Sequence, residues 1–81
     1  MERQWIDRRD NSYWIVEAVP VGPEKRVGGY AHRMWFKAPR RSHAVMVPSN
    51  VGARFRHLSD AELERLLDRA RYRGYWLSTK R

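Results

Sequence analysis

Residues 30–38, YAHRMWFKA, alternate basic and aromatic side chains in a pattern typical of a strand. Because successive side chains of a strand point to opposite faces, Arg33, Trp35 and Lys37 share one face. Cations that contact phosphates, beside an aromatic ring that stacks on bases, are what single-stranded nucleic-acid binding requires. We therefore expect this face to be exposed and to bind RNA or DNA. The alternative is that Trp35 belongs to the core and the charges form a solvated rim.

Further arginines extend this predicted basic surface. Arg40 and Arg41 are adjacent in a predicted turn without a nearby acid, so both should point into solvent. Arg54 and Arg56 alternate with less polar side chains, and they join the same sheet face if both segments turn the same way. The predicted nucleic-acid site comprises Arg33, Trp35, Lys37, Arg40, Arg41, Arg54 and Arg56.

Few residues are suited to catalysis or metal binding. His32, His43 and His57 are the histidines, and their spacing matches no metal-ligand motif. The chain has no cysteine to complete a zinc site, no GxSxG nucleophile motif and no paired carboxylates in an apolar setting. We therefore expect no metal, no cofactor and no enzymatic activity. A small ribonuclease-type toxin that uses histidine as acid and base is the minor alternative.

The positive charge is concentrated in the middle of the chain. The sequence holds 17 lysine and arginine residues against 9 aspartate and glutamate residues, a formal net charge of +8. Residues 24–58 hold eight of the basic residues and one acid, so this segment contributes +7. A localised excess of positive charge attracts polyanions. Arginine outnumbers lysine, which suits binding of phosphate or carboxylate, although a G+C-rich genome would produce the same preference.

The elements that must position these residues are predicted from hydrophobic alternation and turn chemistry. Apolar side chains that alternate between clusters of Pro, Gly, Asn, Asp and Ser predict short strands joined by tight turns. The predicted strands cover residues 3–8, 13–19, 30–38 and 43–47, and residues 53–57 form either a short fifth strand or the approach to a helix.

One C-terminal helix is predicted over residues 60–73. Ser59 and Glu62 have the spacing of a capping box, in which each side chain accepts a hydrogen bond from the other residue's backbone N–H. Four apolar residues recur at i, i+3, i+4 and i+7 and form one stripe that must pack against the sheet. The stripe comprises Leu63, Leu66, Leu67 and Ala70.

These elements predict a single α+β domain over residues 1–81. A four- or five-stranded antiparallel sheet, connected as a meander, is packed by the C-terminal helix. Closure of a strongly curled sheet into a small SH3-like barrel is the alternative. A length of 81 residues suits one small domain.

The leading hypothesis is a small, non-enzymatic module that binds RNA or DNA. The alternative is an accessory subunit or adaptor that docks on a larger acidic protein assembly through Trp35, Tyr75 and Trp76, with arginines at the rim. Whether Tyr75, Trp76 and Leu77 pack in the domain or on a partner stays open, as does the oligomeric state. No segment is apolar enough to span a membrane, and the N-terminus lacks the apolar core of a signal peptide, so we expect a cytoplasmic protein.

Overall fold

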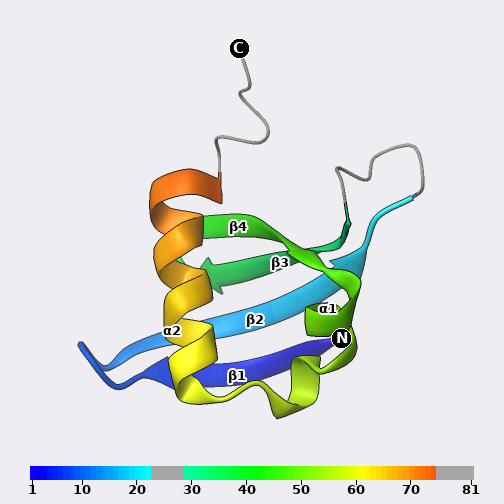
Figure 1. Cartoon of the computed structure of the whole chain (residues 1–81). Coiled ribbons are helices and arrows are strands. Elements are labelled where there is room, and N and C mark those ends of the chain that lie inside the picture. Colours follow the sequence, from blue (N-terminus) through cyan, green and yellow to red (C-terminus); the bar gives the residue numbers. More distant parts are fainter. Residues whose placement is uncertain (23–28, 75–81) are drawn as a thin grey trace.

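Four antiparallel strands form a sheet with the order β1–β2–β3–β4, so each strand pairs with its neighbour in the sequence (Figure 1). The computed structural model describes residues 1–22 and 29–74, so Tyr75, Trp76 and Leu77 lie outside the described residues. The predicted α+β meander with a C-terminal helix is confirmed. Within the described residues, β1 and β4 are the edges of the sheet and do not pair, so the alternative barrel is not formed.

The elements follow the predicted order with one addition. The strands are β1 (Glu2–Asp7), β2 (Ser12–Pro20), β3 (Tyr30–Ala38) and β4 (Arg41–Pro48). They are followed by α1 (Ser49–Ala53), the 3-10 helix η2 (Phe55–His57), α2 (Asp60–Arg69) and the π-helical turn η3 (Ala70–Gly74). The predicted helix over residues 60–73 therefore consists of α2 and most of η3.

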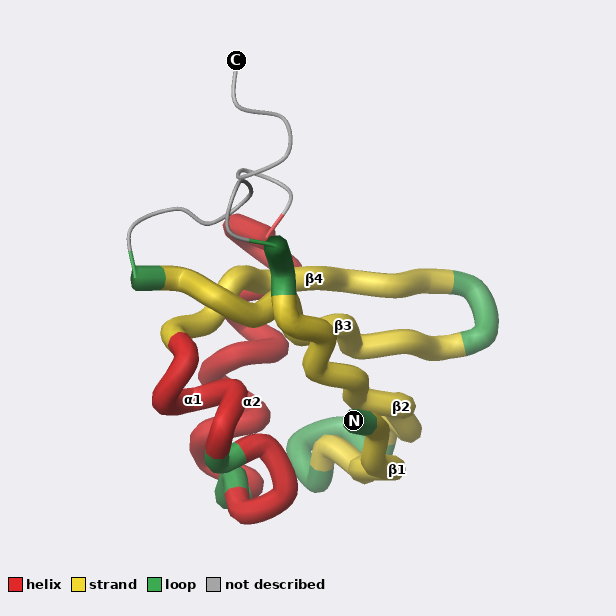
Figure 2. The backbone as a smooth tube through the Cα atoms, turned by 90° about the vertical axis from the view of Figure 1, so that its right-hand side faces the viewer, coloured by secondary structure: helices red, strands yellow, loops and turns green. Residues whose placement is uncertain are grey.

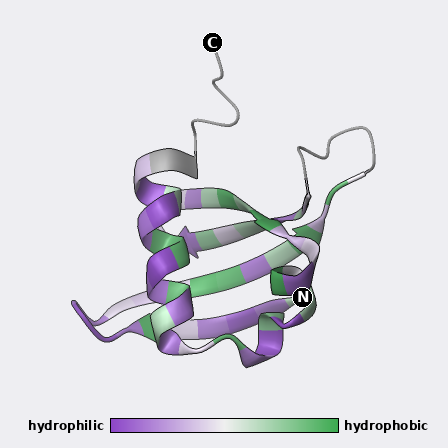
Figure 3. Ribbon diagram, in the orientation of Figure 1, coloured by the Kyte–Doolittle hydropathy of each residue, from purple (hydrophilic) through white to green (hydrophobic). Residues whose placement is uncertain are grey.

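The turn between β1 and β2 sets the register of the first hairpin. Asn11 has a φ of 62°, in the left-handed region that asparagine tolerates better than most residues. The carbonyl oxygen of Asp7 accepts hydrogen bonds from the amides of Asp10 and Asn11, at 3.3 and 2.7 Å. The resulting register places Trp5 directly opposite Trp14. The turn itself is hydrophilic, whereas the middle of β2 beneath α2 is hydrophobic (Figure 3).

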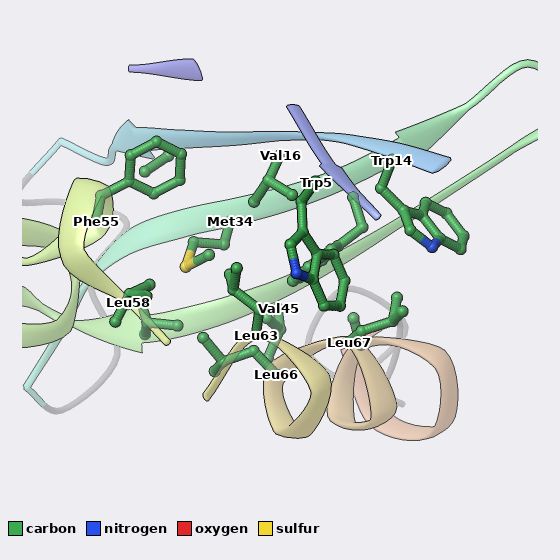
Figure 4. Packing of buried hydrophobic residues seen from close by; sticks show 14 residues of the cluster. Trp5, Trp14, Val16, Met34, Val45, Phe55, Leu58, Leu63, Leu66 and Leu67 are labelled. Carbon is green, nitrogen blue, oxygen red and sulfur yellow. The ribbon is translucent and has the colours of Figure 1, made fainter. Parts of the chain in front are cut away.

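The core lies between the helices and one face of the sheet. Both α1 and α2 lie on the same side of the sheet (Figure 2). The leucine stripe of α2 points toward the strands, where Trp14 and Phe36 are fully buried (Figure 4). Burying one such large side chain stabilises the fold by about 1.5–3 kcal/mol. The stripe is therefore part of the core, as predicted.

The start of α2 is fixed by its cap and by β1. The predicted capping box is confirmed, because Ser59 Oγ accepts from the Glu62 amide at 3.2 Å and Glu62 Oε1 accepts from the Ser59 amide at 2.9 Å. The Trp5 Nε1 donates to Asp60 Oδ1 at 3.0 Å, and Arg8 pairs with the same carboxylate at 3.0 Å. These contacts hold the first turn of α2 against the edge strand.

Of the two alternatives for residues 53–57, the fifth strand is not formed: these residues continue from α1 into η2 and lead to α2. A strand would place Ala53, Phe55 and His57 on one face, yet Phe55 is buried while the other two are exposed. The Arg3 Nη1 donates to the carbonyl oxygen of Phe55 at 3.2 Å, and the Leu58 amide donates to the same oxygen at 3.5 Å. The helical path therefore buries Phe55 alone.

Candidate nucleic-acid interface

We call the sheet face that points away from α1 and α2 the open face. Arg33, Trp35 and Lys37 lie on it, because the buried Met34 and Phe36 take the alternate positions of β3. The Arg33 Cζ lies 6.0 Å from the centroid of the Trp35 ring, at the outer limit of a cation–π contact. The structure thus brings these three predicted residues together, with Arg33 exposed and Trp35 partly exposed.

Carboxylates on the neighbouring strands balance the charge of the open face. The Lys37 Nζ donates to Glu17 Oε1 on β2, and this hydrogen bond raises the pKa of Lys37 and lowers that of Glu17. Glu2 of β1 lies directly opposite Glu17, so two carboxylates share the face with Arg33 and Lys37. A balanced surface attracts a polyanion less strongly than a basic one.

The two arginines of the β3–β4 turn lie elsewhere. Arg40 is exposed in the turn, and Arg41 begins β4. The Arg41 Cζ lies 4.9 Å from the centroid of the Trp14 ring, within cation–π range. Because Trp14 is buried on the helix side of the sheet, Arg41 is separated by the sheet from Arg33 and Trp35.

A second arginine contacts the same indole ring. The Arg71 Cζ lies 5.5 Å from the centroid of the Trp14 ring, and the His43 ring lies 5.9 Å from it. The Trp14 Nε1 donates to Ser12 Oγ at 2.8 Å, which orients the ring. We call Trp14, Arg41, His43 and Arg71 the Trp14 cluster. Both guanidinium groups are therefore within cation–π range of the same ring.

Arg71 is not among the predicted site residues, although the sequence holds a signal for it. Arg71 lies four residues after Leu67 and eight after Leu63, which extends the apolar stripe of α2 by one position. Arg41 likewise shares the alternation of the core-facing His43. A cation at a core-facing position near the end of an element indicates the rim of the core, where its charge can reach solvent.

Two carboxylates near the Trp14 cluster already pair with another arginine, Arg9. Arg9 binds the buried Asp7 at 2.8 Å through Nη2 and Asp68 at 2.9 Å through Nη1. The hydrogen bond with Arg9 holds the pKa of Asp7 below its usual value and raises the pKa of Arg9. Among the residues that the structure describes, neither Arg41 nor Arg71 has a carboxylate within ion-pair distance.

Burial and the charges of Arg41 and Arg71 affect the pKa of His43. Burial lowers the pKa of His43 below its usual 6.5, and the charges of Arg71 and Arg41 lower it further. His43 is therefore mainly neutral at neutral pH and adds a hydrogen-bonding group, not a charge, to the Trp14 cluster.

Arg54 and Arg56 are not brought to either surface. Arg54 pairs with Glu62 at 3.1 Å beside the start of α2, and Arg56 is exposed on η2. Arg71 follows the end of α2, and a ten-residue helix is about 15 Å long. The seven predicted residues therefore lie in three places. Arg33, Trp35 and Lys37 lie on the open face. Arg41 belongs to the Trp14 cluster, with Arg40 in the adjoining turn, and Arg54 and Arg56 lie before the start of α2.

The histidines do not form an acid–base pair. His43 lies opposite Phe36 in the β3–β4 register, and His32 is four residues from Phe36 along β3, a distance of about 13 Å. His32 packs against Gly52, where a Cβ atom would lie 2.5 Å from the His32 Cγ, and His57 is exposed on η2. Within the described parts of the chain, no group of three or more His, Cys, Asp or Glu side chains is placed to hold a metal ion.

The chain matches no protein-family model, no curated protein and no solved structure. Across residues 1–22 and 29–74, no helix has the length and apolar character needed to cross a membrane. The residues themselves provide two surfaces of different character: a balanced open face with exposed apolar side chains, and a Trp14 cluster with two arginines that lack described carboxylate partners.

Proposed function

We propose that this protein is a small, non-enzymatic module that binds the phosphate backbone of RNA or DNA through Arg41 and Arg71, with Arg40 beside them. One observation supports the proposal above all. Two guanidinium groups lie against one buried indole ring, and no described carboxylate lies within ion-pair distance of either of them. Hydrogen bonds with Arg9 and Ser12 lower the pKa of Asp7 and of Asp10, respectively, and the charge of Arg71 lowers both pKa values further.

The packing of these arginines suits phosphate recognition. Arg41 and Arg71 both contact the Trp14 ring, so two like charges are collected around one side chain, and an anion bound there would offset their repulsion. A guanidinium group whose flat face rests on an aromatic ring keeps its N–H donors free at the edge, and those donors match two phosphate oxygens. Side chains held in place before binding also lose less conformational entropy when the ligand arrives.

The open face has a smaller part in this proposal. Lys37 is paired with Glu17, and Arg33 lies at the limit of contact with Trp35. A nucleic acid that wraps the β3–β4 turn from the Trp14 cluster would reach Arg33 and Trp35 only on the other side of the sheet. We therefore assign the main phosphate contacts to Arg41 and Arg71, and additional charge to Arg40.

The absence of an enzymatic role is also part of the proposal. Cleavage of a phosphodiester by histidines needs a base and an acid on either side of one phosphate. His43 alone lies in the Trp14 cluster, and His32 is about 13 Å away along the sheet. Binding without cleavage is the function that this arrangement supports.

Fluorescence anisotropy across a salt series tests the proposal. The probes are labelled single-stranded RNA and DNA and their duplexes, with heparin as a competing polyanion. The test variant combines Arg41→Gln with Arg71→Gln. Its matched control combines Arg65→Gln with Arg69→Gln, which removes the same charge from exposed positions of α2.

We expect the Arg41/Arg71 variant to bind about tenfold more weakly or worse, because a hydrogen bond to a charged group contributes roughly 1.5–3 kcal/mol. Its salt slope on a single strand should fall by about 1.4, since each phosphate contact contributes about 0.7. The control should stay close to wild type. Equal losses in both variants, or equal binding of heparin and nucleic acid, would reject the Trp14 cluster as a phosphate site.

A further inference from the structure

The open face gathers apolar side chains that the fold itself leaves uncovered. Ile6 is 53% exposed, Tyr13 is 46% exposed and Val19 is 38% exposed, and all three point away from the helices. Ile15 and Trp35 lie between them and are partly exposed. Such a group of side chains on one sheet face is typical of a protein interface.

The same face has one acidic half and one basic half. Glu2 lies on β1 and Glu17 on β2, whereas Arg33 and Lys37 both lie on β3. Glu2 and Glu17 are direct cross-strand neighbours, and like charges in that position repel. Lys37 pairs with Glu17, while Glu2 and Arg33 have no ion-pair partner among the described residues. Complementary charges on one surface allow that surface to match a copy of itself.

We propose that two copies of this chain pack open face against open face, related by a two-fold axis parallel to the strands. That axis places β1 of one copy over β4 of the other and β2 over β3, so Glu17 faces the strand that carries Arg33 and Lys37. A two-fold axis perpendicular to the strands would place acids over acids. This proposal goes beyond the proposed function, because it involves none of the residues of the Trp14 cluster.

The size of the open face indicates a reversible dimer. Strands of six to nine residues spaced about 4.8 Å apart define a face of roughly 500 Å² per copy, or about 1,000 Å² in the dimer. That is the lower end of specific interfaces. Ala31 and Met46, at one end of the face, are already buried in the single chain, so the contact should centre on Ile6, Tyr13 and Trp35. Association should therefore depend on protein concentration.

Sedimentation velocity of the full chain, from low micromolar to near-millimolar protein, tests this dimer. The sample is first freed of co-purified nucleic acid with nuclease, so that a bound strand cannot bridge two copies. The test variant is Tyr13→Lys, which places a cation opposite the basic half of the second copy. The matched control is Tyr72→Lys, the same change at a tyrosine that is 75% exposed on η3.

We expect the wild type and Tyr72→Lys to shift from one copy to two as concentration rises, while Tyr13→Lys stays a single copy. Glu17→Lys should also weaken association, and adding Lys37→Glu should partly restore it, because the double exchange leaves neither half with two charges of the same sign. Far-ultraviolet circular dichroism checks that each variant is folded. A wild type that is a single copy at every concentration overturns the proposal. So does a dimer that survives both Tyr13→Lys and Glu17→Lys, or association that nuclease removes.

Discussion

Arginines at the start of α2 meet carboxylates, whereas Arg71, after its end, meets an aromatic ring. Arg54 pairs with Glu62, and Arg8 pairs with Asp60 in the first turn. Arg71 instead lies against Trp14, together with Arg41. The residue type is the same at both ends, so the number of arginines in a segment does not reveal a binding site. The partner that each arginine finds in the fold decides whether its charge is available.

The largest expected effect comes from removing the ring that holds Arg41 and Arg71. Trp14→Ala should destabilise the protein by about 3–5 kcal/mol, because it leaves a cavity in the core and releases both guanidinium groups. Trp14→Phe keeps an aromatic face and should cost less. Urea unfolding followed by circular dichroism measures both changes. If Trp14→Ala costs less than about 1 kcal/mol, the ring does not support this end of the molecule.

A second test concerns the carboxylate that occupies Arg9. Asp7→Asn should cost about 1–3 kcal/mol, because it weakens a buried group that accepts several hydrogen bonds. The folded pKa of Asp7 is lowered from 3.8, so its stabilisation is complete above that pH and is lost as the pH falls through the folded value. Wild type should therefore lose stability below about pH 4 more steeply than Asp7→Asn. Parallel acid-unfolding curves for the two proteins would contradict this assignment.

The pKa of His43 provides a third test, this time of the end of α2. Because burial and the two arginines lower it, folding becomes less stable as the pH falls from neutral through 6.5 toward the folded value. Arg71→Gln should move the pKa of His43 up toward 6.5, whereas Arg54→Gln should not. Titration of the imidazole protons by NMR measures the shift. No change on Arg71→Gln would place Arg71 too far from His43 for the proposed cluster.

The smallest expected effect is on the paired arginine at the start of α2. Arg54→Gln breaks an exposed ion pair, and such pairs contribute little to stability. Its thermal midpoint should stay close to that of wild type, and its affinity for single-stranded RNA should fall less than that of Arg71→Gln. Thermal unfolding and anisotropy, measured on the same preparations, compare the two ends. If Arg54→Gln lost more RNA affinity than Arg71→Gln, the start of α2 and not its end would carry the main phosphate contacts.

The sequence predicted the elements better than the surfaces. Alternation and turn residues identified the four strands, and the Ser59–Glu62 spacing identified the helix start, because these signals are local. Residues 53–57 alternate as a strand would, yet the bond from Arg3 to the carbonyl oxygen of Phe55 joins residues 52 positions apart. No local pattern contains such a contact.

The candidate site was harder to predict for the same reason. Arg33, Trp35 and Lys37 share a face because they alternate on one strand. The charge of that face depends on Glu17, whose position beside Lys37 requires the register of two strands. The contacts of Arg41 and Arg71 with Trp14 join three elements. Only their core-facing positions are visible in the sequence, and those positions resemble ordinary packing.

The shared ring has a thermodynamic consequence. Arg41 lies on β4 of the sheet and Arg71 on η3 of the helical layer, so an anion that binds both would stabilise the contact between the two layers. Ligand binding and resistance to unfolding are then linked, and a ligand at a hundred times its dissociation constant would add about 2.7 kcal/mol to the free energy of unfolding. A rise in melting temperature with added oligonucleotide, absent from the Arg41/Arg71 variant, would thus report occupancy without any label.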